Sequence, residues 1–163
     1  MLPPFVVVPT YHERDNLPPF TQRLWAAVPN ARLLIVDDAC GDGTPDWVRD
    51  QPQNGKQLFI LERAGKLGLG SAYLAGFAWV IERHRTEPCG AVVQMDADLS
   101  HDPNSIPPML DALEKADLVL ATRYREGVRV TNWPLHRLLL SLGAGKYVKW
   151  ITGLPFTDPT GGF

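Results

Sequence analysis

The chain has 163 residues, of which 45% are hydrophobic and 21% are charged, proportions that are ordinary for one globular domain. Its formal net charge of −2 argues against a nucleic-acid-binding protein. The two cysteines, Cys40 and Cys89, show neither a disulfide framework nor metal-ligand spacing, which favours a reduced cytoplasmic setting. Because no apolar run approaches the ~18 residues of a membrane-spanning helix, we expect a soluble or peripheral protein.

Short apolar runs alternate with helical patterns along the chain. Strands are predicted at residues 5–8, 32–36, 57–61, 91–95 and 117–121. Helices are predicted over residues 17–28, from residue 45 onward, and over residues 71–84, 103–115 and 135–151. This alternation predicts an α/β fold with a mostly parallel sheet. No repeat, linker or low-complexity segment divides the sequence, so we expect residues 1–163 to form a single domain.

Capping signals and apolar faces define three of the helices. Asn16 is placed to cap the first helix, and Thr44 to cap the second, with Pro45 at its first position. The apolar residues that recur on one face of the first helix are Leu17, Phe20, Leu24 and Val28. Those expected to face the core from the helix over residues 103–115 are Ile106, Met109, Leu110 and Leu113.

The most informative stretch is an apolar strand, expected to be buried, that leads directly into Asp96 and Asp98. In open α/β sheets, ligands bind at the carboxyl ends of the strands, and Mg²⁺ or Mn²⁺ prefers carboxylate oxygens. The alternative is that both aspartates cap the following turn and helix. His101 and Asp102 have the chemistry of a general-base pair, but we favour a structural role for both.

Acidic side chains follow two further strands. Glu13 comes after the first strand, and the pair Asp37 and Asp38 comes after the second. Acids gathered at the mouth of a parallel sheet repel a phosphate, whereas a bound metal converts the same acids into a diphosphate site. The carboxylates that remain can hold ribose hydroxyls or base N–H groups. The sequence therefore predicts a nucleotide site without a phosphate loop.

The glycine-rich loop at residues 64–70 matches neither a dinucleotide fingerprint nor a Walker loop, because Tyr73 and Ile60 stand where those motifs need glycine. The loop keeps one cation, Lys66, shortly before a helix, an arrangement that suits anions in general. A plain connection between strand and helix is the alternative.

Basic residues outnumber acidic ones between residues 118 and 157, where Glu126 is the sole acid. The basic residues are Arg123, Arg125, Arg129, Arg137, Lys146 and Lys149. Such an excess suits an anionic ligand or a membrane surface, although a solvated face is the simpler interpretation. The helix over residues 135–151 likewise either packs on the sheet or lies on a membrane surface.

A set of short motifs occurs in order along nearly the whole chain. The motifs are Val8-Pro9-Thr10-Tyr11-His12-Glu13, Val36-Asp37-Asp38-Ala39-Cys40-Gly41-Asp42-Gly43-Thr44, Gly65-Lys66-Leu67-Gly68-Leu69-Gly70, Met95-Asp96-Ala97-Asp98, Arg123-Tyr124, Asn132-Trp133-Pro134-Leu135-His136-Arg137 and Thr160-Gly161-Gly162-Phe163. Each motif alone is weak, but the ordered set resembles the polyprenol-phosphate (dolichol-phosphate) mannosyltransferases, which are inverting glycosyltransferases. The resemblance implies the GT-A (Rossmann-like) fold, a mostly parallel sheet flanked by helices with the nucleotide at the carboxyl ends of the strands.

The resemblance also implies residue roles. Donor-binding roles fall to Pro9, Tyr11, Glu13, Asp38, Lys66 and Asp96. Asp96 and Asp98 would bind Mg²⁺ or Mn²⁺ on the diphosphate of GDP-mannose. The phosphate of the lipid acceptor would be held by Arg123, Arg137 and Ser141. The catalytic residues would be Asp98, Arg123 and Arg137.

The implied reaction is a single in-line displacement with inversion, from GDP-mannose to a polyprenyl (dolichyl) phosphate, by a cytoplasmic protein at the membrane surface. An acceptor phosphate, with a second pKa near ~6, needs no strong general base. The alternatives are a polyprenyl-phosphate glucosyltransferase or another nucleotide-sugar transferase, and a nucleotide-binding domain without turnover.

Some positions depart from the pattern of the family. His12, Cys40 and Ser100 stand where Asn, Ser and sometimes a metal-binding Gln are usual, which leaves the donor base and the metal shell open. Members of the family also continue beyond the motif that ends at Phe163. We therefore expect one glycosyltransferase catalytic domain that is either truncated at its C-terminus or minimal.

Overall fold

A computed structural model describes residues 2–122, 143, 148 and 150–153. The chain divides into two compact units, Met1–Leu110 and Asp111–Phe163, and each is described by itself. The first unit contains the whole of the described sheet and, of the α-helices α1 to α4 in the described part of the chain, all but the last two residues of α4. None of the described helices is both long and apolar enough to cross a membrane.

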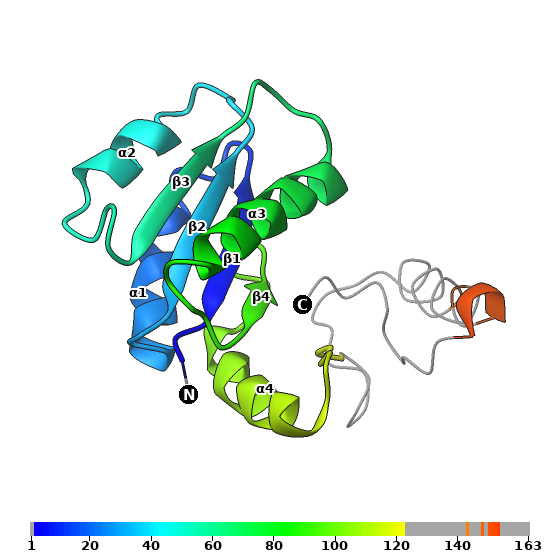
Figure 1. The fold of residues 1–163 in the computed structure, drawn as a ribbon. Coiled ribbons are helices and arrows are strands. Elements are labelled where there is room, and N and C mark those ends of the chain that lie inside the picture. The colour runs from blue at the N-terminus through cyan, green and yellow to red at the C-terminus, as the bar shows by residue number, and fades with distance from the viewer. Residues whose placement is uncertain (1, 123–142, 144–147, 149, 154–163) are drawn as a thin grey trace. The chain divides into compact units, whose positions relative to one another are not determined.

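The core of the first unit is a sheet of four parallel strands, β1 (Phe5–Thr10), β2 (Arg32–Asp37), β3 (Leu58–Glu62) and β4 (Val92–Gln94). Within the described residues their order is β3-β2-β1-β4, which confirms the predicted parallel α/β arrangement (Figure 1). β1 and β2 are paired along their whole length, with Phe5 opposite Arg32 and Thr10 opposite Asp37. Their carboxyl ends therefore lie side by side, and the loops that follow them begin at the same edge of the sheet.

The helices between residues 2 and 122 are α1 (Leu17–Ala27), α2 (Thr44–Asp50), α3 (Leu69–His84) and α4 (Ile106–Ala112), with short 3-10 turns η1 (Pro103–Ser105) and η2 (Leu113–Lys115) on either side of α4. α3 crosses one face of the sheet, while α1 lies behind it (Figure 1). The buried residues that join α3 to the sheet are Phe5, Val7, Leu34, Val36, Phe59, Ala72, Tyr73 and Val80. The helix packs tightly on the sheet at Gly76, where an added Cβ would lie only 2.5 Å from Cγ1 of Val7.

Two of the strand predictions are corrected by the structure. The segment at residues 117–121 pairs with no strand of the described sheet, and Leu118 is 59% exposed. An apolar pattern is not sufficient there, since a strand also needs a neighbour that supplies backbone hydrogen bonds. β4 is short, and Val92 is 42% exposed because β4 has only one neighbouring strand, β1, among the described residues. The prediction that this strand is buried is therefore wrong at Val92, although Met95 just beyond it is fully buried.

The helix starts also differ from prediction. Asn16 does not cap α1 with its side chain, because its amide donates to the Glu13 carboxylate instead. Thr44 is the first residue of α2, and the preceding turn is made by Gly43, whose φ of 81° is in the left-handed region that glycine tolerates. α3 begins two residues earlier than predicted, at Leu69.

The helix predicted over residues 103–115 is divided into η1, α4 and η2. Pro107 and Pro108 have no N–H group, so the α-helical bonds to residues 103 and 104 cannot form, and the first turn is a 3-10 turn. Of the four residues expected in the core, Ile106 is buried and the other three are half-buried.

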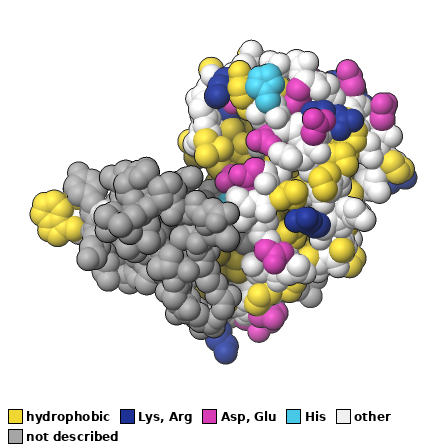
Figure 2. Space-filling model, turned by 180° about the vertical axis from the view of Figure 1, so that it is seen from behind, with side chains coloured by type: hydrophobic (Ala, Val, Ile, Leu, Met, Phe, Trp, Pro, Cys, Tyr) yellow, Lys and Arg dark blue, Asp and Glu magenta, His cyan; other side chains and the backbone are white. Residues whose placement is uncertain are grey.

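The surface of the described residues mixes charges of both signs. On the face shown in Figure 2, acidic, basic and apolar side chains are interspersed. This distribution agrees with the formal net charge of −2 and gives this face no large single-sign field.

The predicted helix over residues 135–151 lies mostly outside the described residues. Its described residues Gly143, Val148, Trp150 and Ile151 are helical.

Candidate active site

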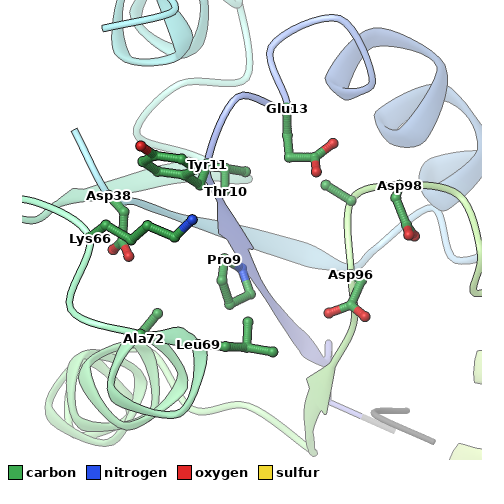
Figure 3. Close-up of a pocket in the computed structure, with 12 residues that line it drawn as sticks. Pro9, Thr10, Tyr11, Glu13, Asp38, Lys66, Leu69, Ala72, Asp96 and Asp98 are labelled. Atoms are coloured by element: carbon green, nitrogen blue, oxygen red, sulfur yellow. The ribbon is translucent and has the colours of Figure 1, made fainter. Parts of the chain in front are cut away.

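A pocket of about 250 Å³ opens at the carboxyl ends of β1, β2 and β4 (Figure 3). It is lined by Pro9, Thr10, Tyr11, Glu13, Asp38, Lys66, Gly68, Leu69, Ala72, Asp96, Ala97 and Asp98. The structure thus brings together every predicted donor-binding and metal-binding residue. The predicted acceptor residues Arg123, Arg137 and Ser141 lie outside the described residues.

The loop after β1 contributes an aromatic ring and a carboxylate. Nζ of Lys66 lies 3.9 Å from the centre of the Tyr11 ring, so the glycine-rich loop reaches the pocket through its single cation. Glu13 stands on the opposite side, near Asp96 and Asp98 (Figure 3). The structure therefore places Lys66 at the pocket, and a role for it in donor binding stays a prediction.

The adjacent acids Asp37 and Asp38 have different environments. Asp37 is buried at the end of β2, where its carboxylate accepts hydrogen bonds from Thr10 Oγ1 at 3.2 Å and from the N–H of Ala39 at 3.0 Å. Burial raises the pKa of Asp37 despite these bonds. Asp37 does not line the pocket, whereas Asp38 does.

Asp38 is held by an arginine that the sequence did not predict. Nη1 of Arg63 lies 3.0 Å from Oδ1 of Asp38, and both side chains are only 8% exposed. The other guanidinium nitrogen, Nη2, donates to Oγ of Ser71 at 2.7 Å. The ion pair therefore fixes Asp38 and largely compensates its charge.

Asp96 and Asp98 are held by neutral donors instead. The Tyr73 hydroxyl donates to Oδ1 of Asp96 at 2.9 Å. Burial, reinforced by the charge of Asp96, raises the pKa of Tyr73, so the phenol stays protonated. The N–H of Ser100 donates to Oδ1 of Asp98 at 2.9 Å. Burial raises the pKa of Asp98, but the hydrogen bonds from Ser100 outweigh it and the pKa lies below its usual value.

His101 and Asp102 have structural contacts, as favoured above. Nδ1 of His101 accepts the backbone N–H of Asp96 at 3.2 Å, and its Nε2 lies 3.9 Å from Oδ2 of the same residue. Asp102 caps η1 by accepting the N–H of Asn104 at 3.0 Å. Because Nδ1 of His101 accepts a hydrogen bond, a neutral His101 ring carries its proton on Nε2, which lies on the side of the Asp96 carboxylate.

The aspartate pair fits a hard divalent cation. Asp96 and Asp98 offer only oxygen atoms, and the hydrogen bonds from Tyr73 and Ser100 do not fill all the acceptor sites of the two carboxylates. Both lie at the pocket wall, and the Asp96 side chain is 38% exposed. Mg²⁺ and Mn²⁺ bind through one or two carboxylates and complete their shells with water and substrate phosphate. Tyr73 would orient one of these ligands from behind.

The loops after β1, β2 and β4 each contain one residue other than glycine with a left-handed backbone. These residues are His12 at φ 61°, Ala39 at φ 50° and Leu99 at φ 63°. Such conformations cost about 1–3 kcal/mol in residues other than glycine, and they cluster at functional sites. The three loops are therefore strained where the polar side chains gather.

Sequence reasoning did not name Arg63, Tyr73 or five of the lining residues as parts of the site; the five are Thr10, Gly68, Leu69, Ala72 and Ala97. Arg63 gave a weak signal, because a cation directly after a strand lies at the same sheet edge as the acids. Tyr73 gave none, since its place in the apolar face of α3 is equally typical of a core residue.

Comparison with known proteins gives these features a context. Residues 5–162 match Glycosyl transferase family 2. The undecaprenyl-phosphate mannosyltransferase of Micrococcus luteus is 41% identical over 96% of this chain and 63% of that protein. The polyprenol monophosphomannose synthase of Mycolicibacterium smegmatis is 39% identical over 97% of this chain and 59% of that protein. The chain thus spans about three fifths of the length of these relatives.

A solved structure supports the fold. The mannosyltransferase from Pyrobaculum calidifontis, in complex with GDP-Man and Mn²⁺, is similar with a TM-score of 0.57 over 77% of this chain and 37% of that chain. Because the sequence identity is only 21%, this similarity supports a common fold and nothing more. The parallel sheet with its flanking helices is the predicted GT-A architecture, and the chain belongs to glycosyltransferase family 2.

Proposed function

We propose that this protein transfers mannose from GDP-mannose to a polyprenyl (dolichyl) phosphate, with inversion at the anomeric carbon. The observation that carries the proposal is the meeting of Asp38, Asp96 and Asp98 in one pocket at the carboxyl edge of the sheet. Relatives named undecaprenyl-phosphate mannosyltransferase and polyprenol monophosphomannose synthase support it.

Donor binding divides between the two sides of the pocket. Asp38 and Tyr11, on one side, suit a nucleoside, since a fixed carboxylate accepts base N–H or ribose hydroxyl groups and a ring stacks on a base. Asp96 and Asp98, on the other, would hold Mg²⁺ or Mn²⁺ against the diphosphate. The metal supplies charge neutralisation of the leaving group. Lys66 adds a cation at the same pocket.

Acceptor activation requires little from the protein. The second pKa of a phosphate monoester lies near ~6, so the acceptor is largely dianionic at neutral pH and needs no strong base. This agrees with His101, whose Nδ1 is engaged by the backbone of Asp96. Arg123 and Arg137, with Ser141, would position the acceptor phosphate, because guanidinium groups bind phosphate oxygens in pairs. The protein would work in the cytoplasm, at the membrane surface where its acceptor resides.

A second candidate is a nucleotide-binding domain without turnover. The observation in its favour is that the described pocket holds the predicted donor-binding and metal-binding residues, whereas the predicted acceptor residues lie outside the described residues. It predicts metal-dependent binding of nucleotide with no transfer of sugar.

A transfer assay separates these functions. GDP-mannose, a short polyprenyl phosphate and Mg²⁺ or Mn²⁺ should yield the polyprenyl-phosphate mannose, while UDP-glucose and GDP-glucose serve as the competing donors. Arg137→Ala should lower transfer and leave GDP binding unchanged. If GDP binds but no donor gives a lipid product, the protein is a nucleotide-binding domain without turnover. If UDP-glucose is the preferred donor, the protein is a polyprenyl-phosphate glucosyltransferase.

A further inference from the structure

We propose that His12, Cys40 and Asp42 form a second metal site, for a borderline or soft ion of the Zn²⁺ class. A ring nitrogen, the thiol sulfur and a carboxylate oxygen of these residues all lie within 4.8 Å of one another. They form the single such group of three or more His, Cys, Asp or Glu residues among those the structure describes. None of the three lines the pocket, so this site is separate from the Asp96–Asp98 pair and does not depend on the proposed function.

The fold brings the three residues together from two loops. Thr10 at the end of β1 lies opposite Asp37 at the end of β2, so the loops that follow start side by side. The backbone N–H of His12 donates to Sγ of Cys40 at 3.1 Å, which fixes the two loops to each other across 28 positions of sequence. N–H groups of this kind commonly orient ligand atoms from outside a metal shell.

Asp42 is oriented in the same way. Its Oδ2 accepts the backbone N–H of Arg14 at 3.2 Å, and its Oδ1 accepts that of Thr44 at 2.9 Å. The backbone of both loops therefore already positions the Asp42 carboxylate.

The donor set selects the ion. One imidazole, one thiolate and one carboxylate suit Zn²⁺, whereas Mg²⁺ and Mn²⁺ prefer oxygen atoms alone. With metal–ligand distances of ~2.0–2.3 Å, small side-chain rotations bring three atoms within 4.8 Å of one another onto a shared ion. Three protein ligands leave the fourth tetrahedral position to water. On binding, the Cys40 thiol would release its proton to solvent.

The site is open to solvent and lies next to the pocket. His12 is exposed while Cys40 and Asp42 are half-buried, so an ion can enter from solvent. The His12 ring packs edge-on against Tyr11, with ring centres 4.5 Å apart, and Tyr11 lines the pocket. A bound ion would therefore fasten the strained loop after β1 to the loop after β2, next to the pocket.

Cobalt titration of the whole chain tests the site. Co²⁺ replaces Zn²⁺ in such sites, and a cobalt–thiolate bond adds a charge-transfer absorption in the near ultraviolet that oxygen ligands do not give. With excess Mg²⁺ present to occupy carboxylate sites, we expect this band to saturate at one ion per chain and to disappear when Zn²⁺ is added. Absence of the band up to millimolar Co²⁺ would overturn the proposal.

The chain contains a matched control. Cys89 also lies beside a histidine, with Sγ 3.4 Å from Nδ1 of His84, but it belongs to no group of three ligands among the described residues. Cys40→Ser should abolish the band and His12→Asn should weaken Co²⁺ binding about tenfold or more, whereas Cys89→Ser should leave both unchanged. A band that survives in Cys40→Ser, or that is lost in Cys89→Ser, would refute the assignment.

Thermal unfolding provides an independent readout. Zn²⁺ should raise the Tm of the wild-type chain and of Cys89→Ser, since an ion that binds the folded state stabilises it. His12→Asn alters an exposed side chain and should match the wild-type Tm in EDTA. Equal shifts on Zn²⁺ addition for wild type and His12→Asn would contradict the site.

Discussion

The two acidic sides of the pocket are constructed in opposite ways. On the β2 side, Asp38 is 8% exposed and lies against the guanidinium of Arg63. On the β4 side, Asp96 is 38% exposed and is held by the hydroxyl of Tyr73, and Asp98 by an N–H. An arginine compensates the first carboxylate, while neutral donors orient the second pair and leave their charge available. The partner of each acid, more than the acid itself, decides which side can attract a cation.

Helix α3 serves both sides. Ser71, in the first turn of α3, accepts a hydrogen bond from Arg63, and Tyr73, two residues later, donates a hydrogen bond to Asp96. The two environments therefore depend on how closely this helix packs on the sheet. Substitutions can test each side separately and then the helix that joins them.

The largest effect should come from Arg63→Ala. Removing one partner of a buried ion pair leaves Asp38 uncompensated, and the free energy of unfolding should fall by about 3–5 kcal/mol. Urea denaturation measures the change. The double variant Arg63→Met with Asp38→Asn should recover most of the loss, because it removes both charges. A single variant as stable as wild type would mean that the pair does not hold the β2 side.

Asp98→Ala tests the opposite side. Loss of a metal-ligating carboxylate should weaken GDP binding in the presence of Mn²⁺ by about 100-fold, while stability changes little because the side chain is exposed. Calorimetric titration of GDP with and without Mn²⁺ measures this. Asp46→Ala is the control, since its side chain is 82% exposed on α2 and lies outside the pocket. Unchanged binding in Asp98→Ala would remove Asp98 from the metal site.

Gly76→Ala should disturb both sides at once. The new Cβ would lie 2.5 Å from Cγ1 of Val7 and 3.1 Å from Cγ2 of Val36, so α3 must move away from the sheet. Overpacking of this kind costs about 1–3 kcal/mol, partly offset by the higher helix propensity of alanine. Gly70→Ala in the same helix meets nothing within 4 Å and should not destabilise the protein. Equal stability of the two variants would exclude a close contact at Gly76.

These side chains also show which features of the fold and the site could be predicted from the sequence alone. Periodicity and strand-end acids predicted the parallel sheet and placed Glu13, Asp38, Asp96 and Asp98 at one edge of it, because parallel strands present their carboxyl ends at a common edge. Pro9 and Tyr11 were assigned to the same site only by the family resemblance. The strand at residues 117–121 was predicted and does not form, since its apolar pattern carries no information about a pairing neighbour.

The contacts that give each acid its character were not predictable. Arg63 meets Asp38, and Tyr73 meets Asp96, across 25 and 23 positions of sequence respectively, and such pairings depend on the register of β3 and the rotation of α3. The cluster of His12, Cys40 and Asp42 escaped notice for the same reason, because its members show no metal-ligand spacing along the chain. Only the register of β1 against β2 brings them together.

Tyr73→Phe is the most conservative test of the β4 side. The variant keeps the ring in the core against Phe77 and removes only the hydroxyl that donates to Asp96. We expect stability to fall by about 1 kcal/mol and Mn²⁺ affinity, measured through GDP binding, by about tenfold, because Asp96 loses the group that orients it. Phe77→Leu, which alters the same cluster without touching Asp96, should leave the affinity unchanged. If both variants lower the affinity equally, packing of α3 rather than the hydroxyl positions Asp96, and the contrast between the two sides would rest on Arg63 alone.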